Sequence, residues 1–328
     1  MRLPVRDELE MPGVHDAPAR SLARVVVGVD FDSASLAVAS WAGRHFATTA
    51  ELTLLHVTPD LPAPNVARIR PSSPRVRGRV PEERARTLRG ALHGLASVAG
   101  GAHIRVEVRA GDPATELAAY ADSVDADLII TGPTATSHLF PRHEVATTAR
   151  LLRRTGRPVL IARDVHTSIA STVLAVVDND GDAPSVLAAA HLVAQPRNGR
   201  IAALHVTNDA SAVSADRVEG WLRAADIPPH RSTVLIATGD RARATLRAAR
   251  DLQAGVIAVG AHTHARSGAW AGDADDGHES DGVARAVVTA TRCSVLVVRI
   301  SGDQVNRRRA SADAQQTIQT RLTVACAR

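Results

Sequence analysis

The sequence repeats itself once, and this repeat constrains the fold more than any other feature. LLHVTPD at residues 54–60 returns almost unchanged as ALHVTND at 203–209. The apolar run VVVGVD, which ends at residue 30, has a counterpart in VLAVVD, which ends at residue 178. Further along, VEVRAGDPATELAAYADSVDADLIITG corresponds to TVLIATGDRARATLRAARDLQAGVIAVG. Such internal similarity indicates that one structural unit occurs twice in the chain.

Each half alternates apolar runs with helical stretches. Continuous runs of Val, Ile and Leu predict strands that are buried on both faces, as in a parallel sheet. The stretches between them, such as SLAVASWAGRHFA and PSVLAAAHLVA, supply the helical crossovers that parallel pairing requires. In the first of these, Leu36, Ala39, Ser40 and Gly43 mark a face of small residues. The sequence therefore predicts two tandem α/β domains, each an open five-stranded parallel sheet between helices.

Composition shifts suggest where these domains begin and end. The expected order is a flexible leader at 1–22, a first domain at 23–163, a linker at 164–171, a second domain at 172–301 and a basic tail at 302–328. A segment rich in Pro and Arg at 62–81 interrupts the first domain. Its proline content favours a surface loop, and a lid over the ligand-binding edge is the alternative.

The charge of the chain is +5, and its basic tail contributes +3 of this. No aromatic residues are interleaved with the tail arginines for stacking on bases, so a nucleic-acid partner is not expected. No apolar run reaches the roughly 18 residues of a membrane helix, and residues 1–20 lack the apolar core of a signal peptide. Two cysteines, Cys293 and Cys326, form no disulfide framework. We therefore expect a cytoplasmic protein, with Cys293 in its core rather than acting as a nucleophile.

The first apolar run of each half ends on an aspartate, Asp30 or Asp178. In an open parallel sheet the carboxyl ends of the strands share one edge, and ligands bind there where the strand order reverses. A carboxylate at that edge can accept hydrogen bonds from an adenine amino group or a ribose hydroxyl. Alternatively, both aspartates are N-caps of the helices that follow, because Asp is a favoured cap.

The order of four segments carries a resemblance to a known family. VGVD, LLHV, GDPATELAAYADSVDADLIITG and RPVLIAR resemble the universal stress protein family, and AVVD, ALHV, GVIAVG and CSVLVV resemble a second copy. The resemblance implies strand order 3-2-1-4-5 in each domain and pairing of domains through their last strands. Here that pairing is expected within one chain, as a pseudo-dimer, and a homodimer of the whole chain stays open.

ATP-binding members of that family carry a glycine-rich loop after the fourth strand: Gly, two residues, Gly, nine residues, then Gly-Ser or Gly-Thr. Glycines let backbone N–H groups approach the phosphates. In the first half the spacing is kept but two glycines and the hydroxyl are lost, and Arg142, His138 and His143 lie in the loop. The nucleotide site expected there consists of Asp30, Val57, Gly132, Ala135, Val145 and Ala146.

In the second half the loop is longer and acidic. Its counterpart site consists of Asp178, Val206, Gly260, Thr263 and Gly282, with Asp281 beside the last of these. Phosphate would meet like charge from Asp273, Asp275, Asp276, Glu279 and Asp281. The first half is therefore the favoured nucleotide-binding half.

Two sequence patterns resemble metal-binding sites, but another interpretation is favoured for each. DNDGD at 178–182 starts like a calcium loop, but Ala183 replaces the turn glycine, so an acidic turn before a helix is favoured. His262, His264 and His278 could bind zinc, yet solvated loop histidines are favoured. No Walker loop, G-x-S-x-G elbow or early G-x-G-x-x-G occurs, and no metal cofactor is expected.

The leading hypothesis is a tandem stress-response protein that binds or regulates rather than catalyses. It would hold ATP, AMP or another adenine nucleotide in its first domain without appreciable hydrolysis, and act through partner proteins. The alternatives are a scaffolding pseudo-dimer that binds no nucleotide, and a weak ATPase.

Overall fold

A computed structural model describes residues 22–58, 80–100, 104–133, 142–163, 165, 172–178, 181–207, 215–263 and 279–301. The first half contains β1 (Arg24–Gly28), α1 (Ser33–Phe46), β2 (Glu51–Thr58), α2 (Glu82–Val98), β3 (Ile104–Ala110), α3 (Pro113–Ser123), β4 (Leu128–Thr131), α4 (Arg142–Arg154) and β5 (Val159–Ile161). The second half contains β6 (Thr172–Val176), α5 (Ala183–Ala194), η1 (Gln195–Arg197), β7 (Arg200–Thr207), α6 (Ala215–Ala224), η2 (Pro229–Arg231), β8 (Ser232–Thr238), α7 (Arg241–Asp251), β9 (Val256–Thr263), α8 (Glu279–Ala290) and β10 (Ser294–Ser301).

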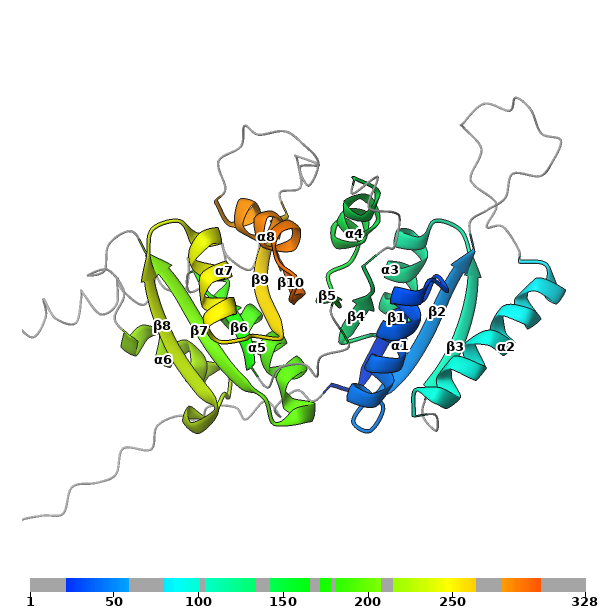
Figure 1. Cartoon of the computed structure of the whole chain (residues 1–328), viewed down its shortest axis with the longest axis horizontal. Helices are drawn as coiled ribbons and strands as arrows, with labels where there is room; N and C mark the ends of the chain where they lie inside the picture. Colours follow the sequence, from blue (N-terminus) through cyan, green and yellow to red (C-terminus); the bar gives the residue numbers. More distant parts are fainter. Residues whose placement is uncertain are drawn as a thin grey trace, which may run out of the picture.

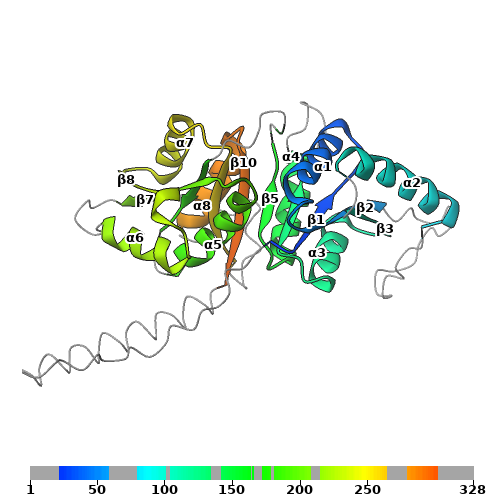
Figure 2. The ribbon, with the colours of Figure 1, turned by 90° about the horizontal axis from the view of Figure 1, so that it is seen from below.

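All of these strands belong to one ten-stranded mixed sheet, in the order β3-β2-β1-β4-β5-β10-β9-β6-β7-β8 (Figure 1). Counted within each half, this is the order 3-2-1-4-5 twice, which confirms the prediction of two open α/β units. The strands within a half are parallel. At the centre β5 and β10 lie side by side (Figure 2) and pair antiparallel, with Leu160 opposite Leu296. The two domains thus join through their last strands within one chain, as expected.

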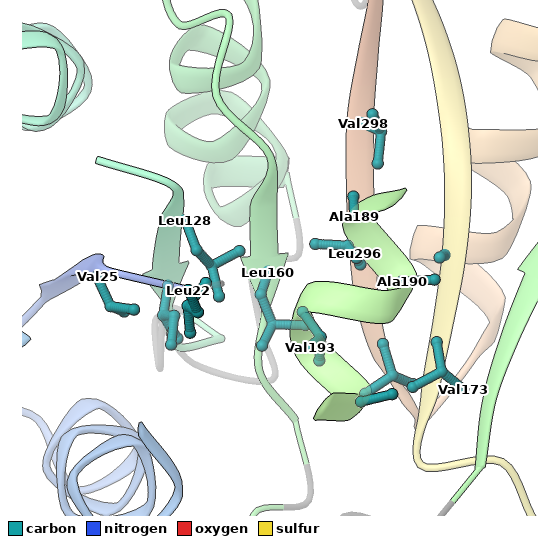
Figure 3. Packing of buried hydrophobic residues seen from close by; sticks show 14 of the residues in the cluster. Leu22, Val25, Leu128, Leu160, Val173, Ala189, Ala190, Val193, Leu296 and Val298 are labelled. Carbon is teal, nitrogen blue, oxygen red and sulfur yellow. The ribbon is translucent and has the colours of Figure 1, made fainter. Parts of the chain in front are cut away.

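The helices form two layers, and each layer covers both halves of the sheet. One buried cluster joins residues of α1, α2, α5 and α6 to one face of the sheet, and a second joins α3, α4, α7 and α8 to the other face. Figure 3 shows residues of both halves in the first cluster, including Leu160 from β5, Val193 from α5 and Leu296 from β10. Because each hydrophobic core continues across the junction, the two halves are packed together and not merely tethered.

The predicted small-residue face of α1 lies against α2. A methyl group added at Gly43 would lie 2.3 Å from the carbonyl oxygen of Ala99, which directly follows α2. The glycine at position 43 therefore lets α1 lie close to the end of α2. Burial of Trp41 and Phe46 on the same helix completes this packing.

Several expectations concern segments that lie outside the described residues. These are the leader up to residue 21, most of the 62–81 segment, all of the expected linker except residue 165, and the tail beyond 301. Among the described residues, no helix is both long enough and apolar enough to cross a membrane.

Candidate functional site

The strand register brings the first-half candidates to one edge of the sheet. Val27 of β1 pairs with Leu54 of β2 and with Ile130 of β4. Counting onward from these pairs, Asp30, Val57 and Gly132 all lie at the carboxyl edge. This edge includes the point between β1 and β4 where the strand order reverses, which is where open α/β sheets bind ligands.

Asp30 is exposed at this edge and is not the cap of α1. The cap is Asp32, whose Oδ1 accepts the N–H of Ser35 at 2.6 Å. The Asp30 carboxylate accepts the N–H of Asp32 at 3.1 Å, and within the described part of the chain Asp30 forms no ion pair. The cap interpretation of Asp30 is therefore wrong. Its side chain is left with acceptor capacity facing solvent at the switch point.

Gly132 directly follows β4 and lies against the start of α1. A methyl group added there would lie 3.4 Å from Ser35 Cα and 3.5 Å from Ser35 N. The glycine thus lets the first turn of α1 approach the end of β4, which is a packing role independent of any phosphate.

Of the remaining first-half candidates, Val145 and Ala146 do not lie in the expected loop. Ala135 lies outside the described residues, as does His138. Val145 and Ala146 lie inside α4, which begins at Arg142, rather than in a loop before the helix. They therefore do not lie in a loop, and their part in a nucleotide site stays a prediction. A helix built on that segment satisfies its backbone donors internally after the first turn.

His56 is a site residue that the sequence reasoning did not single out. Its Nδ1 donates a hydrogen bond to the carbonyl oxygen of Val29 at 2.7 Å, and its ring packs 4.7 Å from the ring of Phe31. Phe31 has φ of 67°, a left-handed conformation that is uncommon for residues with a side chain. His56 therefore fixes the carbonyl group of Val29 and the ring of Phe31, which lie on either side of Asp30 in the sequence. The signal in the sequence that could have identified His56 is the segment Leu-His-Val, which occurs in both halves.

The second half repeats this histidine contact. His205 donates from Nδ1 to the carbonyl oxygen of Val177 at 2.9 Å, and its ring packs against Trp221. His205 is buried, whereas His56 is half-buried. The two halves thus fix the strand end before each aspartate in the same way.

The aspartate of the second half has a different neighbour. Nη1 of Arg241, at the start of α7, lies 3.0 Å from Oδ2 of Asp178. Both side chains are largely buried, with 27% exposure for Arg241 and 14% for Asp178. As in the first half, the cap interpretation is wrong: the residue that precedes α5 is Asp182. Asp178 is engaged in an internal ion pair.

The other second-half candidates do not lie in a loop either. Gly260 and Thr263 lie within β9, in register with Val298 and Ser301 of β10, and Gly282 lies within α8. A methyl group added at Gly260 would lie 3.3 Å from Ile300 Cγ1, so packing accounts for that glycine. Val206 is buried in β7. Gly260, Thr263 and Gly282 therefore do not lie in a loop, and their part in a nucleotide site stays a prediction.

The minor candidates add little to the site. Cys293 lies just before β10, half-buried and packed against the second buried cluster. Of the three histidines considered for zinc, His262 has its backbone in β9, and His264 and His278 lie outside the described residues. Among the described residues, no group of three His, Cys, Asp or Glu side chains is arranged to hold a metal ion.

Comparison with known proteins agrees with this geometry. The model of the universal stress protein family matches residues 22–163. The first half of the chain is a universal stress protein domain. The second half repeats the strand order of that universal stress domain and joins it in one sheet. Among the curated proteins, none matches the chain.

Solved structures with two such domains match nearly the whole chain. A universal stress protein from Archaeoglobus fulgidus matches with a TM-score of 0.58 and 19% identity, over 86% of this chain and 98% of that chain. A functionally unknown protein from Pseudomonas aeruginosa matches with a TM-score of 0.53 and 18% identity, over 89% and 98%. At these identities the matches establish the tandem universal stress fold.

A smaller universal stress protein, solved in complex with cAMP, also matches part of the chain. The identity is 28% and the TM-score 0.32, over 43% of this chain and 97% of that one.

Proposed function

We propose that this chain is a binding and regulatory protein that holds an adenine nucleotide in its first half. The observation that carries the proposal is the difference between the two strand-end aspartates. Asp30 is exposed at the switch point and forms no ion pair among the described residues, whereas Asp178 is paired with Arg241. Of these two aspartates, only Asp30 therefore presents a carboxylate that a ligand could use directly.

The chemistry of the first-half edge suits the base or the sugar of a nucleotide. A carboxylate accepts hydrogen bonds from an adenine amino group or a ribose hydroxyl, and bonds to a charged acceptor are stronger than neutral ones. His56 and the cap residue Asp32 hold the strand end and the helix start on either side of Asp30. The ligand would meet an acceptor whose backbone is already fixed, which reduces the entropy lost on binding.

Binding without appreciable hydrolysis follows from the sequence at the phosphate end. Ala135, Val145 and Ala146 stand where the nucleotide-binding members have two glycines and a hydroxyl. Phosphoryl transfer depends on a precisely positioned triphosphate and Mg²⁺. A regulatory role in stress response, in the cytoplasm and through partner proteins, is the corresponding cellular proposal.

Titration calorimetry of ATP, AMP and cyclic AMP into the full chain tests this proposal. Asp30→Ala should weaken binding roughly ten- to hundredfold, the range expected for losing hydrogen bonds to a charged group. Asp178→Ala is the matched control, because it removes the equivalent carboxylate from the second half and should leave affinity unchanged. Equal effects of the two variants would show that the first half is not the site.

The main alternative is a scaffolding pseudo-dimer that binds no nucleotide. The continuous ten-stranded sheet, with both cores crossing the junction, favours it. Absence of heat with every nucleotide would support this alternative. Phosphate release from ATP above an enzyme-free blank, abolished by Asp30→Ala, would support a weak ATPase instead.

A further inference from the structure

In the second half, the arginine of the ion pair, Arg241, is the first residue of α7. Arg241 follows the cap residue Asp240, whose Oδ1 accepts the N–H of Arg243 at 2.7 Å. From this first turn the Arg241 guanidinium reaches Asp178, which lies 63 residues earlier in the chain. The contact therefore depends on how α7 packs on the sheet and not on local sequence.

The first half has the same helix start but a different residue at this position. α3 follows the cap residue Asp112, whose Oδ1 accepts the N–H of Thr115 at 3.1 Å. The segments GDPATEL and GDRARATL align so that Pro113 corresponds to Arg241. Proline has no side-chain donor, so the first half has nothing at this position that could bind the Asp30 carboxylate.

An arginine at this position supplies the kind of group that a ligand would supply. A guanidinium N–H donates to a carboxylate as an adenine amino group or a ribose hydroxyl does, and it adds a positive charge. Because both side chains are largely buried, a ligand that displaced Arg241 would leave that charge without its partner. The hydrogen bonds of a neutral nucleoside could not compensate for the free energy of leaving the buried Arg241 charge without a partner.

We propose that Arg241 closes the second site by acting as an internal substitute for the ligand. The residue at the first position of the third helix in each half thus decides which half binds, with arginine closing the site and proline leaving it open. The chain then takes one nucleoside per polypeptide, in the first half. The inference rests on the proposed function for the identity of the ligand and for its binding in the first half.

Adenosine is the probe that tests this directly. It lacks phosphate, so the acidic residues between 273 and 281 do not repel it. In calorimetry on the full chain, Arg241→Ala should add a second equivalent of bound adenosine, and adding Asp178→Ala should remove it. Arg243→Ala is the matched control, because it removes the same charge from the same turn and should add nothing. Absence of a second equivalent in Arg241→Ala would overturn the proposal.

The reciprocal exchange tests the same idea from the first half. Pro113→Arg should place a guanidinium beside Asp30 and weaken first-half adenosine binding at least tenfold, whereas Pro113→Ala should bind as the unmodified chain does. Where the unmodified chain binds adenosine, unchanged binding by Pro113→Arg would overturn the proposal even if Arg241→Ala proved unstable.

Failure of the proposed function gives a different pattern. If the unmodified chain binds no adenosine but Arg241→Ala binds one equivalent that Asp178→Ala removes, the proposal about Arg241 stands and the first-half site is lost. Absence of adenosine binding in the unmodified chain and in every variant would contradict both the proposal about Arg241 and the proposed function.

Discussion

Arg163 and Arg299 hold the two halves together reciprocally. Arg163, just after β5, donates from Nη1 to the carbonyl oxygens of Val288 and Thr291 at the end of α8, at 2.6 Å and 3.0 Å. Arg299, in β10, donates from Nη1 to the carbonyl oxygens of Arg153 and Thr155 at the end of α4, at 3.3 Å and 3.2 Å. Each cation lies where a helix has unpaired carbonyl groups and the negative end of its dipole.

This arrangement predicts that either arginine contributes to the stability of the whole chain. Arg163→Ala or Arg299→Ala should lower the free energy of unfolding by about 1–3 kcal/mol, because charged donors to part-buried carbonyls are lost. Urea unfolding followed by circular dichroism measures this. Arg292→Ala, at an exposed position just after α8, should cost little. A cost as large for Arg292→Ala would show that general charge, not helix capping, is responsible.

The helix glycines give a second prediction, in which one substitution has opposite effects at two places. Gly43→Ala should destabilise by about 1–3 kcal/mol, because its methyl group would overlap Ala99. Gly90→Ala in α2 has nothing within 4 Å of the new methyl group and should stabilise by about 0.5–1 kcal/mol. Thermal unfolding of both variants measures the difference. Stabilisation by Gly43→Ala would mean that α1 and α2 can move apart without cost.

The sequence predicted the parts of this structure that depend on local pattern. Apolar runs and helical spacing predicted two open parallel sheets with helical crossovers, whereas the strand order 3-2-1-4-5 was implied by the resemblance to the universal stress protein family. The face containing Gly43 was recognisable from its small residues. The cap assignment failed because Asp30 and Asp32 both fit the start of α1, and only the hydrogen bonds distinguish them.

Other features depend on tertiary packing and were not predictable. Nothing in either local sequence indicates that Arg241 meets Asp178, since the contact joins α7 to the end of β6. The phosphate-loop positions were assigned by aligning the glycine-rich motif of the resembled family, and such an alignment does not show where β9 ends or α4 begins. His56 was visible in a repeated segment, but its bond to Val29 requires the β1–β2 register.

His56 leads to a third prediction, with its counterpart as control. His56→Ala should weaken nucleotide binding several-fold, because the peptide before Asp30 loses a hydrogen bond and Phe31 loses its ring contact. His205→Ala removes the equivalent bond in the second half and should leave nucleotide affinity unchanged. Calorimetry with the nucleotide that binds best measures both. If both variants lower affinity equally, His56 acts only through overall stability.

The last prediction concerns His45, a buried residue on α1 that lies near the junction of the halves. Burial lowers the pKa of His45; a hydrogen bond to the Trp41 carbonyl oxygen opposes this, and the positive charges of Arg197 and Arg44 lower the pKa further. The buried histidine is therefore neutral in the folded chain at pH values where it is already protonated in the unfolded chain.

The direction of the pH effect follows from this difference. Below the unfolded pKa of about 6.5, the unfolded state binds a proton that the folded state does not, so stability falls as the pH falls. Urea unfolding between pH 7.5 and pH 5 should show this loss, and His45→Gln, which cannot titrate, should show less of it. His93→Gln, at an exposed position of α2, is the control and should leave the pH dependence unchanged. An identical pH dependence in His45→Gln and the unmodified chain would show that His45 is not the titrating group.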